Sequence, residues 1–187
     1  MYERIIHEKA NYMTQEVVLV NEKNEMTGTA EKMEAHLKGL LHRAFSIFIF
    51  NANGDMLLQQ RALQKYHSAG LWSNACCSHP APGEDLQQAA LKRLREEMGF
   101  ETPLFPVFDF IYKADFENGL TEYEFDHVLA GEYDGPVYFN PDEVMDFSFR
   151  SLTEIRQGIE TRPDQYTAWF PLAFPKIFDW WRLKYGQ

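Results

Sequence analysis

Two Asn-Gly pairs restrict the fold of this chain more than any other feature. Each lies between two strand-like runs, Asn53-Gly54 in the first half of the chain and Asn118-Gly119 in the second, where the runs also alternate. Asn-Gly favours the tight turn that joins neighbouring antiparallel strands. The sequence therefore predicts two β-hairpins, with strands at residues 44–51 and 56–62, and at residues 107–113 and 121–133.

One helix is predicted between the hairpins. Asp85 is suited to cap its N-terminus and Gly99 to end it. Apolar residues recur at every fourth position between them: Leu86, Ala90, Leu94 and Met98. This spacing gives one apolar face, so we expect a helix over residues 85–98 that packs against the strands.

Residues 63–84, rich in Ser, Gly, Pro, Asn and His, are expected to form a long functional loop. Before the first hairpin we expect a strand at 17–21 and a turn at 24–28, followed by a polar connection to Leu40. After the second hairpin, a capping box predicts a helix from Ser151 to about residue 159. A final helix is expected over 166–185, interrupted by Pro171 and Pro175. Strands around a central helix, with helices at the end, predict an α+β or α/β class with a mixed sheet.

Length and composition favour a single domain. The chain has 187 residues, 45% of them hydrophobic, and contains no repeat or flexible linker. We expect an N-terminal arm at residues 1–15 and one domain over residues 16–187. The 18 Lys and Arg against 28 Asp and Glu give a net charge of -10, which disfavours nucleic acid and anionic membranes as partners.

The cysteines indicate a compartment. Cys76 and Cys77 are neighbours in the chain, so they cannot cross-link distant segments as the disulfides of secreted domains do. No apolar run resembles a signal peptide or is long enough to span a membrane. The sequence predicts a cytoplasmic protein.

The strand at 121–133 has an unusual acidic row. Alternate side chains of a strand share a face, so Glu122, Glu124 and Asp126 point one way, and Tyr123 and His127 point the other. One interpretation is the solvated face of an edge strand. The other is a metal site or a pair of catalytic carboxylates, since like charges this close need a cation between them.

Histidines are the second set of candidate ligands: His7, His36, His42, His67, His79 and His127. No two have the tight spacing of a zinc motif, so each is also consistent with a surface or core residue. Three histidine nitrogens with two carboxylates would suit zinc, manganese or iron(II) better than magnesium.

The two cysteines face opposite ways if residues 76–79 are extended. Cys77 then shares a face with His79, and Cys76 is a packing residue. Both thiols are also consistent with small buried hydrophobes. A cation near Cys77 would lower the pKa of its thiol toward the range useful for proton transfer, so Cys77 is the candidate acid or base.

On the predicted helix, Arg93 and Glu97 lie four residues apart on the face away from the apolar stripe. An ordinary surface ion pair is the simplest interpretation. The significance of the other cations, Lys32, Arg61 and Lys65, depends on the fold.

Taken together, several segments resemble the type I isopentenyl-diphosphate isomerases. They are residues 28–36, 61–65, 71–80, 122–124 and 142–146. The most specific are a Trp-x-Asn-x-x-Cys-x-His-Pro block at 72–80 and a Glu-x-Glu strand at 122–124. The resemblance runs in order over roughly residues 16–180.

That family has the Nudix fold, which implies an α/β/α sandwich. A degenerate Nudix box extends from Ser78 through Glu84 to Gly99. Ser78 replaces its opening Gly, and Lys92-Arg93 stands where a Nudix hydrolase has Arg-Glu. Both departures favour an isomerase over a hydrolase.

The resemblance also implies roles for individual residues. It implies five ligands to one divalent metal, Mn2+ or Zn2+: His36, His42, His79, Glu122 and Glu124. It implies Cys77 and Glu124 as the catalytic groups, with Tyr112 and Trp169 also in the active site. It implies Glu97, with the Cys77 carbonyl, as the holder of a diphosphate-bridged Mg2+, and Lys32, Arg61, Lys65 and Arg93 as diphosphate-binding cations. The spacing from His36 to His42 is one residue shorter than in bacterial relatives.

The implied reaction converts isopentenyl diphosphate to dimethylallyl diphosphate. It adds a proton to the terminal alkene carbon and removes one from the neighbouring methylene, so two acid/base groups are needed. Either Glu124, directly or through Tyr112, or Cys77 could donate first. Trp169 could stabilise the cation-like state or belong to the core.

Two other functions are weighed: a Nudix hydrolase of nucleoside or sugar diphosphates, and a metal-binding domain without catalysis. The expected partner is a small diphosphate, and both a monomer and a homodimer are consistent with the sequence.

Overall fold

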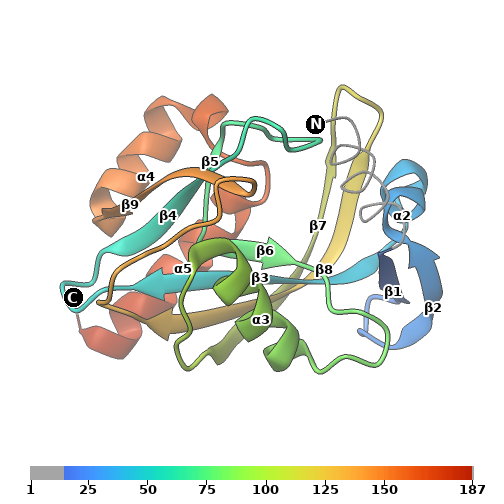
Figure 1. Ribbon diagram of the computed structural model, residues 1–187, viewed down its shortest axis with the longest axis horizontal. Coiled ribbons are helices and arrows are strands. Elements are labelled where there is room, and N and C mark those ends of the chain that lie inside the picture. Colours follow the sequence, from blue (N-terminus) through green and yellow to red (C-terminus); the bar gives the residue numbers. More distant parts are fainter. Residues whose placement is uncertain (1–14, 187) are drawn as a thin grey trace.

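The computed structural model describes residues 15–186, and its strands form a mixed β-sheet between helices (Figure 1). The central strand is β3 (His42–Phe50). It runs parallel to β8 (Thr121–Glu132) along one edge and antiparallel to β6 (Cys76–Ser78) along the other. β7 (Phe105–Asp115) extends the sheet beyond β8.

The second predicted hairpin is confirmed and the first is only half right. β7 pairs with β8 from the turn outward. β3 and β4 (Met56–Arg61) have the predicted strands and turn but share one residue pair, Phe50 with Met56. Beyond it, β4 pairs with β9 (Val144–Arg150) and β5 (Trp72–Ser73). The predicted pairing of β3 with β4 is confirmed only next to the turn, because β6 takes that edge of β3 farther along the strand.

The predicted central helix is confirmed as α3 (Leu86–Met98). The Asp85 side chain accepts a hydrogen bond from the backbone N–H of Gln88. Gly99 ends the helix with a φ of 75°, and a Cβ there would lie 2.2 Å from the Tyr138 carbonyl oxygen. Only glycine fits both constraints.

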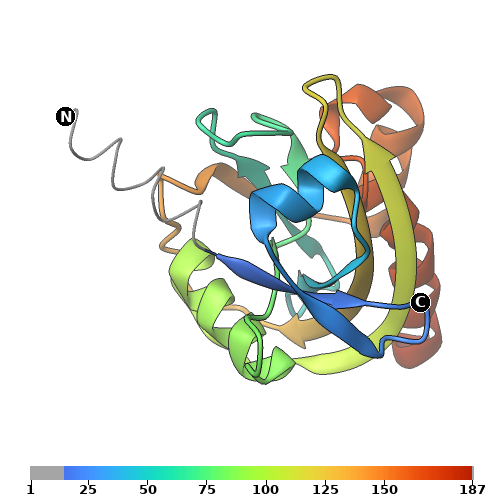
Figure 2. The same cartoon turned by 90° about the vertical axis from the view of Figure 1, so that its right-hand side faces the viewer.

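Helices cover both faces of the sheet (Figure 2). Phe45, Ile47 and Ile49 of β3 share a core cluster with α3, whereas Phe48 and Phe50 share one with α5 (Phe170–Tyr185). Burial on both faces explains the nearly continuous apolar run of β3. The α/β/α arrangement confirms the predicted α+β class.

Regular structure also forms where the sequence predicted turns and connections. The predicted turn at 24–28 and the polar connection to Leu40 are replaced by β2 (Met26–Glu31) and α2 (Lys32–Lys38). α2 has only seven residues, too few for a periodic signal, and burial of Ala35 and His36 stabilises it. β9 was not predicted, and β5 and β6 lie within the predicted loop at 63–84.

The two C-terminal helices begin in different ways, because only α4 has a side-chain cap. α4 (Leu152–Thr161) opens with the predicted capping box. α5 is not interrupted by its prolines: Pro171 lies in the first turn, where no backbone N–H is needed, and the helix continues through Pro175.

Apart from Gln15, the predicted N-terminal arm lies outside the described residues. Within residues 15–186, none of the helices is both long and apolar enough to cross a lipid bilayer.

Candidate functional site

A cavity of about 260 Å³ opens beside the inner face of β8. It brings together residues that lie far apart in the sequence. The predicted catalytic residues line it: Cys77, Glu124, Tyr112 and Trp169. The predicted diphosphate-binding cations also line it: Lys32, Arg61, Lys65 and Arg93. Of the predicted metal ligands, His79, Glu122 and Glu124 reach the wall.

The acidic row of β8 faces inward. Glu122, Glu124 and Asp126 are 4%, 7% and 1% exposed, whereas Tyr123 and Phe125 are half-buried. The interpretation of this row as a solvated face is therefore wrong. The pattern is the reverse of an ordinary edge strand because the buried face of β8 borders a polar cavity.

Strand register places the key polar side chains next to one another. His42 of β3 pairs with Glu124 of β8, and Glu124 pairs with Tyr112 of β7. On the other edge of β3, Ser46 pairs with Cys77 of β6. Neighbouring strands lie about 5 Å apart, so the cavity wall is a row of polar groups on adjacent strands.

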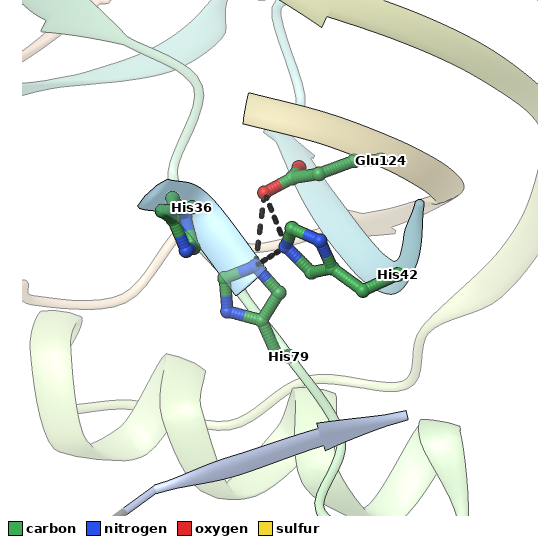
Figure 3. A group of neighbouring side chains, drawn as sticks. All are labelled: His36, His42, His79 and Glu124. Atoms are coloured by element: carbon green, nitrogen blue, oxygen red, sulfur yellow. Dashed lines mark hydrogen bonds and ion pairs between the residues drawn. The ribbon is translucent and has the colours of Figure 1, made fainter. Parts of the chain in front are cut away.

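Three histidines and one carboxylate form a buried cluster (Figure 3). The ligand atoms of His36, His42, His79 and Glu124 all lie within 4.8 Å of one another. His79 Nε2 is 2.9 Å from Glu124 Oε1 and 3.2 Å from His42 Nε2. The shortened spacing from His36 to His42 therefore does not keep His42 out of the cluster.

Backbone hydrogen bonds orient two of these rings. His36 Nδ1 donates to the Lys32 carbonyl and His42 Nδ1 donates to the Leu40 carbonyl, each over 2.7 Å. This leaves both Nε2 atoms as lone-pair donors directed into the cluster, and His36 Nε2 is buried without a hydrogen-bond partner among the described residues. Such an orphaned, convergent set fits a divalent metal ion.

Burial keeps two members of the cluster in the protonation state that a metal requires. It lowers the pKa of His36, and lowers that of His79 to about 3. The His36 and His79 imidazoles are therefore neutral at pH 7, as ligation demands.

The pKa values of Glu122 and Glu124, two of the acidic residues of β8, are shifted in opposite directions. Burial opposes ionisation of Glu124, but its interactions with the His42 and His79 side chains bring its pKa well below the usual value. Burial and the charge of Glu124 raise the pKa of Glu122. The Tyr112 hydroxyl lies between them, 2.7 Å from Glu124 Oε2 and 3.2 Å from Glu122 Oε2.

Glu122 lies beside the four-residue cluster rather than within it. It forms a second group of possible ligands with His36 and His67. The sequence singled out Glu122 and His36, but it contained no spacing that would have identified His67. His67 reaches this site through the contact between the loop before β5 and Glu122 of β8.

Cys77 and Cys76 have opposite surroundings, as the extended backbone predicts. Cys76 is buried in the core cluster against α3, and Cys77 lines the cavity. Cys77 Sγ is 3.2 Å from Asn74 Oδ1 and 3.4 Å from Ser46 Oγ. Burial and the charge of Asp126 raise the pKa of the Cys77 thiol, so the polypeptide groups do not supply the expected lowering.

Asn74 links the cysteine to the tryptophan and was not predicted as a separate site residue. Its amide nitrogen donates to the carbonyls of Ile47 and Cys76, which orients Oδ1 toward the cavity. Trp169 Nε1 donates to the same Oδ1 over 3.1 Å. Trp169 therefore belongs both to the core and to the cavity wall.

The cations converge at the mouth of the cavity from separate elements. Lys65 pairs with Glu143 at 2.5 Å, and Arg93 lies 3.5 Å from the same carboxylate. Burial, together with the charges of Lys65 and Arg93, lowers the pKa of Lys32 to about 8. Closely spaced, half-buried cations of this kind favour an anionic ligand.

The ion pair between Arg93 and Glu97 is not a surface pair. The two side chains are 2.5 Å apart, and Glu97 is 5% exposed. Glu97 also accepts a hydrogen bond from Gln59. Its carboxylate is thus held beneath the cation group.

Comparison with known proteins gives both a family and a fold. Residues 40–170 match the NUDIX domain family. The isopentenyl-diphosphate Delta-isomerase of Pectobacterium atrosepticum is 53% identical over 167 residues, which cover 89% of this chain and 93% of that protein. The isopentenyl-diphosphate Delta-isomerase 2 of Photorhabdus laumondii is 49% identical over 176 residues, which cover 91% of this chain and 99% of that protein.

Solved structures agree with the fold. The MutT protein from Methanosarcina mazei Go1 superposes with a TM-score of 0.62 at 18% identity, covering 78% of this chain and 96% of that chain. DR0079 from Deinococcus radiodurans superposes with a TM-score of 0.61 at 20% identity, covering 77% of this chain and 90% of that chain. At these identities the likeness concerns the fold alone.

Proposed function

This chain belongs to the isopentenyl-diphosphate Delta-isomerase family of NUDIX domain proteins, and we propose that its cavity converts isopentenyl diphosphate to dimethylallyl diphosphate. The observation that carries the proposal is the meeting of Cys77, Glu124 and a cluster of cations in one cavity. The isomerase relatives favour this reaction over diphosphate hydrolysis. We assign it to the domain formed by residues 16–187.

The proton transfers are assigned to two sides of the substrate. Cys77 and Glu124 reach the cavity from β6 and β8, which lie on opposite edges of β3. Their strands are therefore about 10 Å apart, enough to admit the reacting end of a substrate between them. Tyr112 donates to Glu124 and so holds or relays a proton on that side. The geometry is compatible with either group donating first.

Trp169 is assigned to the cation-like state. Its indole N–H is held by Asn74, which keeps the ring in the cavity wall. The face of an indole ring attracts a cation by about 0.5–2 kcal/mol, depending on how dry the site is. The aromatic wall also excludes water that would capture the cation.

The proposed metal ligands are His36, His42, His79, Glu122 and Glu124, and this donor set suits Mn2+ or Zn2+. A bound ion supplies positive charge beside the Glu124 carboxylate. Glu97 and the Cys77 carbonyl would hold a Mg2+ ion, which would supply positive charge for the diphosphate. Lys32, Arg61, Lys65 and Arg93 orient that diphosphate at the cavity mouth.

We place the reaction in the cytoplasm, because Cys76 and Cys77 are both free thiols, as a reducing compartment favours. The partner is a small diphosphate. A monomer and a homodimer both fit the proposal.

The deciding experiment uses heavy water. Purified protein is incubated with isopentenyl diphosphate, Mg2+ and Mn2+ in D2O, and the products are followed by NMR. We expect dimethylallyl diphosphate with deuterium at the new methyl group. The proposal is overturned if neither dimethylallyl diphosphate nor deuterium uptake is detected, or if phosphate is released instead.

A further inference from the structure

His67 is a buried side chain to which no role has been given. It lies between β4 and β5, is 8% exposed, and lines the cavity. Its ring stacks on Phe116 with centroids 4.9 Å apart, and it meets Trp169 edge-on at 6.2 Å. The ring is therefore held in one orientation by packing.

The hydrogen bonds of His67 are directed at one carboxylate. Nε2 lies 3.3 Å from Glu122 Oε1, and Nδ1 lies 3.2 Å from Ser68 Oγ. If the Ser68 hydroxyl donates to Nδ1, then Nε2 carries the proton and donates to Glu122. Ser68 has a φ of 51°, a conformation that is rare for serine, and the Arg61 guanidinium donates to the His67 carbonyl. The loop is thus built to present this ring.

Both oxygens of Glu122 are held from different elements. His67 contacts Oε1, and the Tyr112 hydroxyl contacts Oε2 at 3.2 Å. Without these contacts a glutamate side chain would sample several rotamers. With them, its carboxylate is kept close to His36 Nε2, within the group of possible ligands that these residues form.

From this geometry we infer that His67 is a positioning residue, which fixes Glu122 as a metal ligand without binding the ion itself. Both ring nitrogens of His67 already have partners, Nε2 in Glu122 and Nδ1 in Ser68. His67 therefore holds the carboxylate and does not offer a free nitrogen to the ion. The inference rests on the proposed metal-binding role of Glu122.

The test compares two variants. His67→Phe keeps the stacked ring and removes the donor, whereas His67→Gln keeps an N–H that can reach the carboxylate. Mn2+ binding to the metal-free protein is measured from the EPR signal of the free ion. We expect His67→Phe to weaken Mn2+ binding about 10- to 100-fold and His67→Gln to recover most of it. Saturating Mn2+ should restore kcat in His67→Phe with an unchanged KM.

Several results would overturn the inference. One is that His67→Phe binds Mn2+ with the affinity of the parent protein. Another is that His67→Gln loses as much Mn2+ affinity as His67→Phe does. A third is X-ray absorption that counts one imidazole fewer around Mn2+ in His67→Phe than in the parent, because His67 would then be a ligand. Glu122→Gln is the control. If this variant binds Mn2+ with the affinity of the parent protein, then Glu122 is not a ligand and the proposed ligand set itself is wrong.

Discussion

Cys76 and Cys77 are chemically identical neighbours with different surroundings, because β6 is extended and successive side chains leave opposite faces of a strand. Cys76 is fully buried against α3, and Cys77 lies in the cavity between Asn74 and Ser46. Function and stability should therefore separate at these two positions.

We expect Cys77→Ala to lower kcat about 10²- to 10⁴-fold, the usual contribution of a proton-transfer group, with little change in the free energy of unfolding. Cys76→Ala is the matched control, which should retain turnover and lose stability instead. Isomerase kinetics and urea unfolding of both variants make the comparison. If Cys76→Ala proves the more damaging to kcat, the assignment of Cys77 is wrong.

Tyr112 provides a second contrast, because its ring is buried and its hydroxyl touches both carboxylates. Tyr112→Phe removes only that hydroxyl. We expect kcat to fall about 10- to 100-fold with KM within about twofold of the parent. A large rise in KM with an unchanged kcat would show that Tyr112 acts in binding rather than in proton transfer.

Among the elements, β8 shows how a strand can carry chemistry. Its carboxylates face inward because the β8 register places them beside His42 of β3 and Tyr112 of β7. The half-buried aromatic residues lie on its other face. The cost of burying three acidic side chains on one strand is offset by hydrogen bonds from neighbouring strands, as between Ser46 and Asp126 over 2.7 Å.

The end of α3 allows a test of backbone constraint. Gly99 and Gly119 have similar φ values, 75° and 79°. A Cβ added at Gly99 would lie 2.2 Å from the Tyr138 carbonyl oxygen, whereas a Cβ added at Gly119 would have no neighbour within 4 Å among the described residues. Gly119→Ala should cost about 1–2 kcal/mol of unfolding free energy, from the left-handed conformation alone. Gly99→Ala should cost more, because the chain at Tyr138 must also move. Equal losses in denaturant unfolding would contradict this reading of the contact.

Over the whole molecule, the site lies where the sheet divides. β3 remains with β8 and β6 while β4 departs to β9, and the cavity collects side chains from both groups of strands. The net charge of -10 does not prevent an anion from binding there. Charges beyond about 8 Å are largely screened at physiological salt, so the local cations dominate.

The buried histidines couple the stability of the whole fold to pH. Burial lowers the pKa of His36, lowers that of His79 to about 3 and lowers that of His67 to about 2, against about 6.5 in an unfolded chain. Below pH 6.5 the unfolded chain therefore binds more protons than the folded chain, and stability falls as the pH falls.

For EDTA-treated protein we expect the free energy of unfolding to decrease by roughly 1 kcal/mol per pH unit for each of His67 and His79 between about pH 6 and pH 4. Urea unfolding across this range measures the slope. His67→Phe is the matched variant and should give a shallower slope. A slope that does not change in the variant would show that His67 does not contribute to the linkage.

Addition of Mn2+ should raise the melting temperature at pH 7.5, because an ion that binds only the folded chain stabilises it. The increase should persist near pH 5, because burial lowers the pKa of His79 to about 3 and protons do not compete for its ring nitrogen there. Scanning calorimetry with and without Mn2+ at both pH values is the measurement. The same increase in Glu124→Gln as in the parent would place the ion elsewhere.

Local interactions account for what could be predicted along the chain. The ends of α3, the turn of the second hairpin and the capping box of α4 depend on residues a few positions apart, and these were right. The two faces of β8 and of β6 follow from the period of an extended chain, so Cys77 and His79 could be placed on one side before any contact was known. The resemblance to a family supplied the identity of the ligands.

Contacts between distant segments account for the rest. Alternation separates the faces of β8, but it cannot say which face is buried, because that depends on the strands and helices that cover it. The pairing of β3 depends on competition between β8, β6 and β4 for its two edges. His67 has no local signal at all, and it reaches Glu122 only because the loop before β5 folds back over β8. Local preferences are set by chain neighbours and therefore appear in the sequence, whereas the site is set by side chains that meet only when the sheet closes around the cavity.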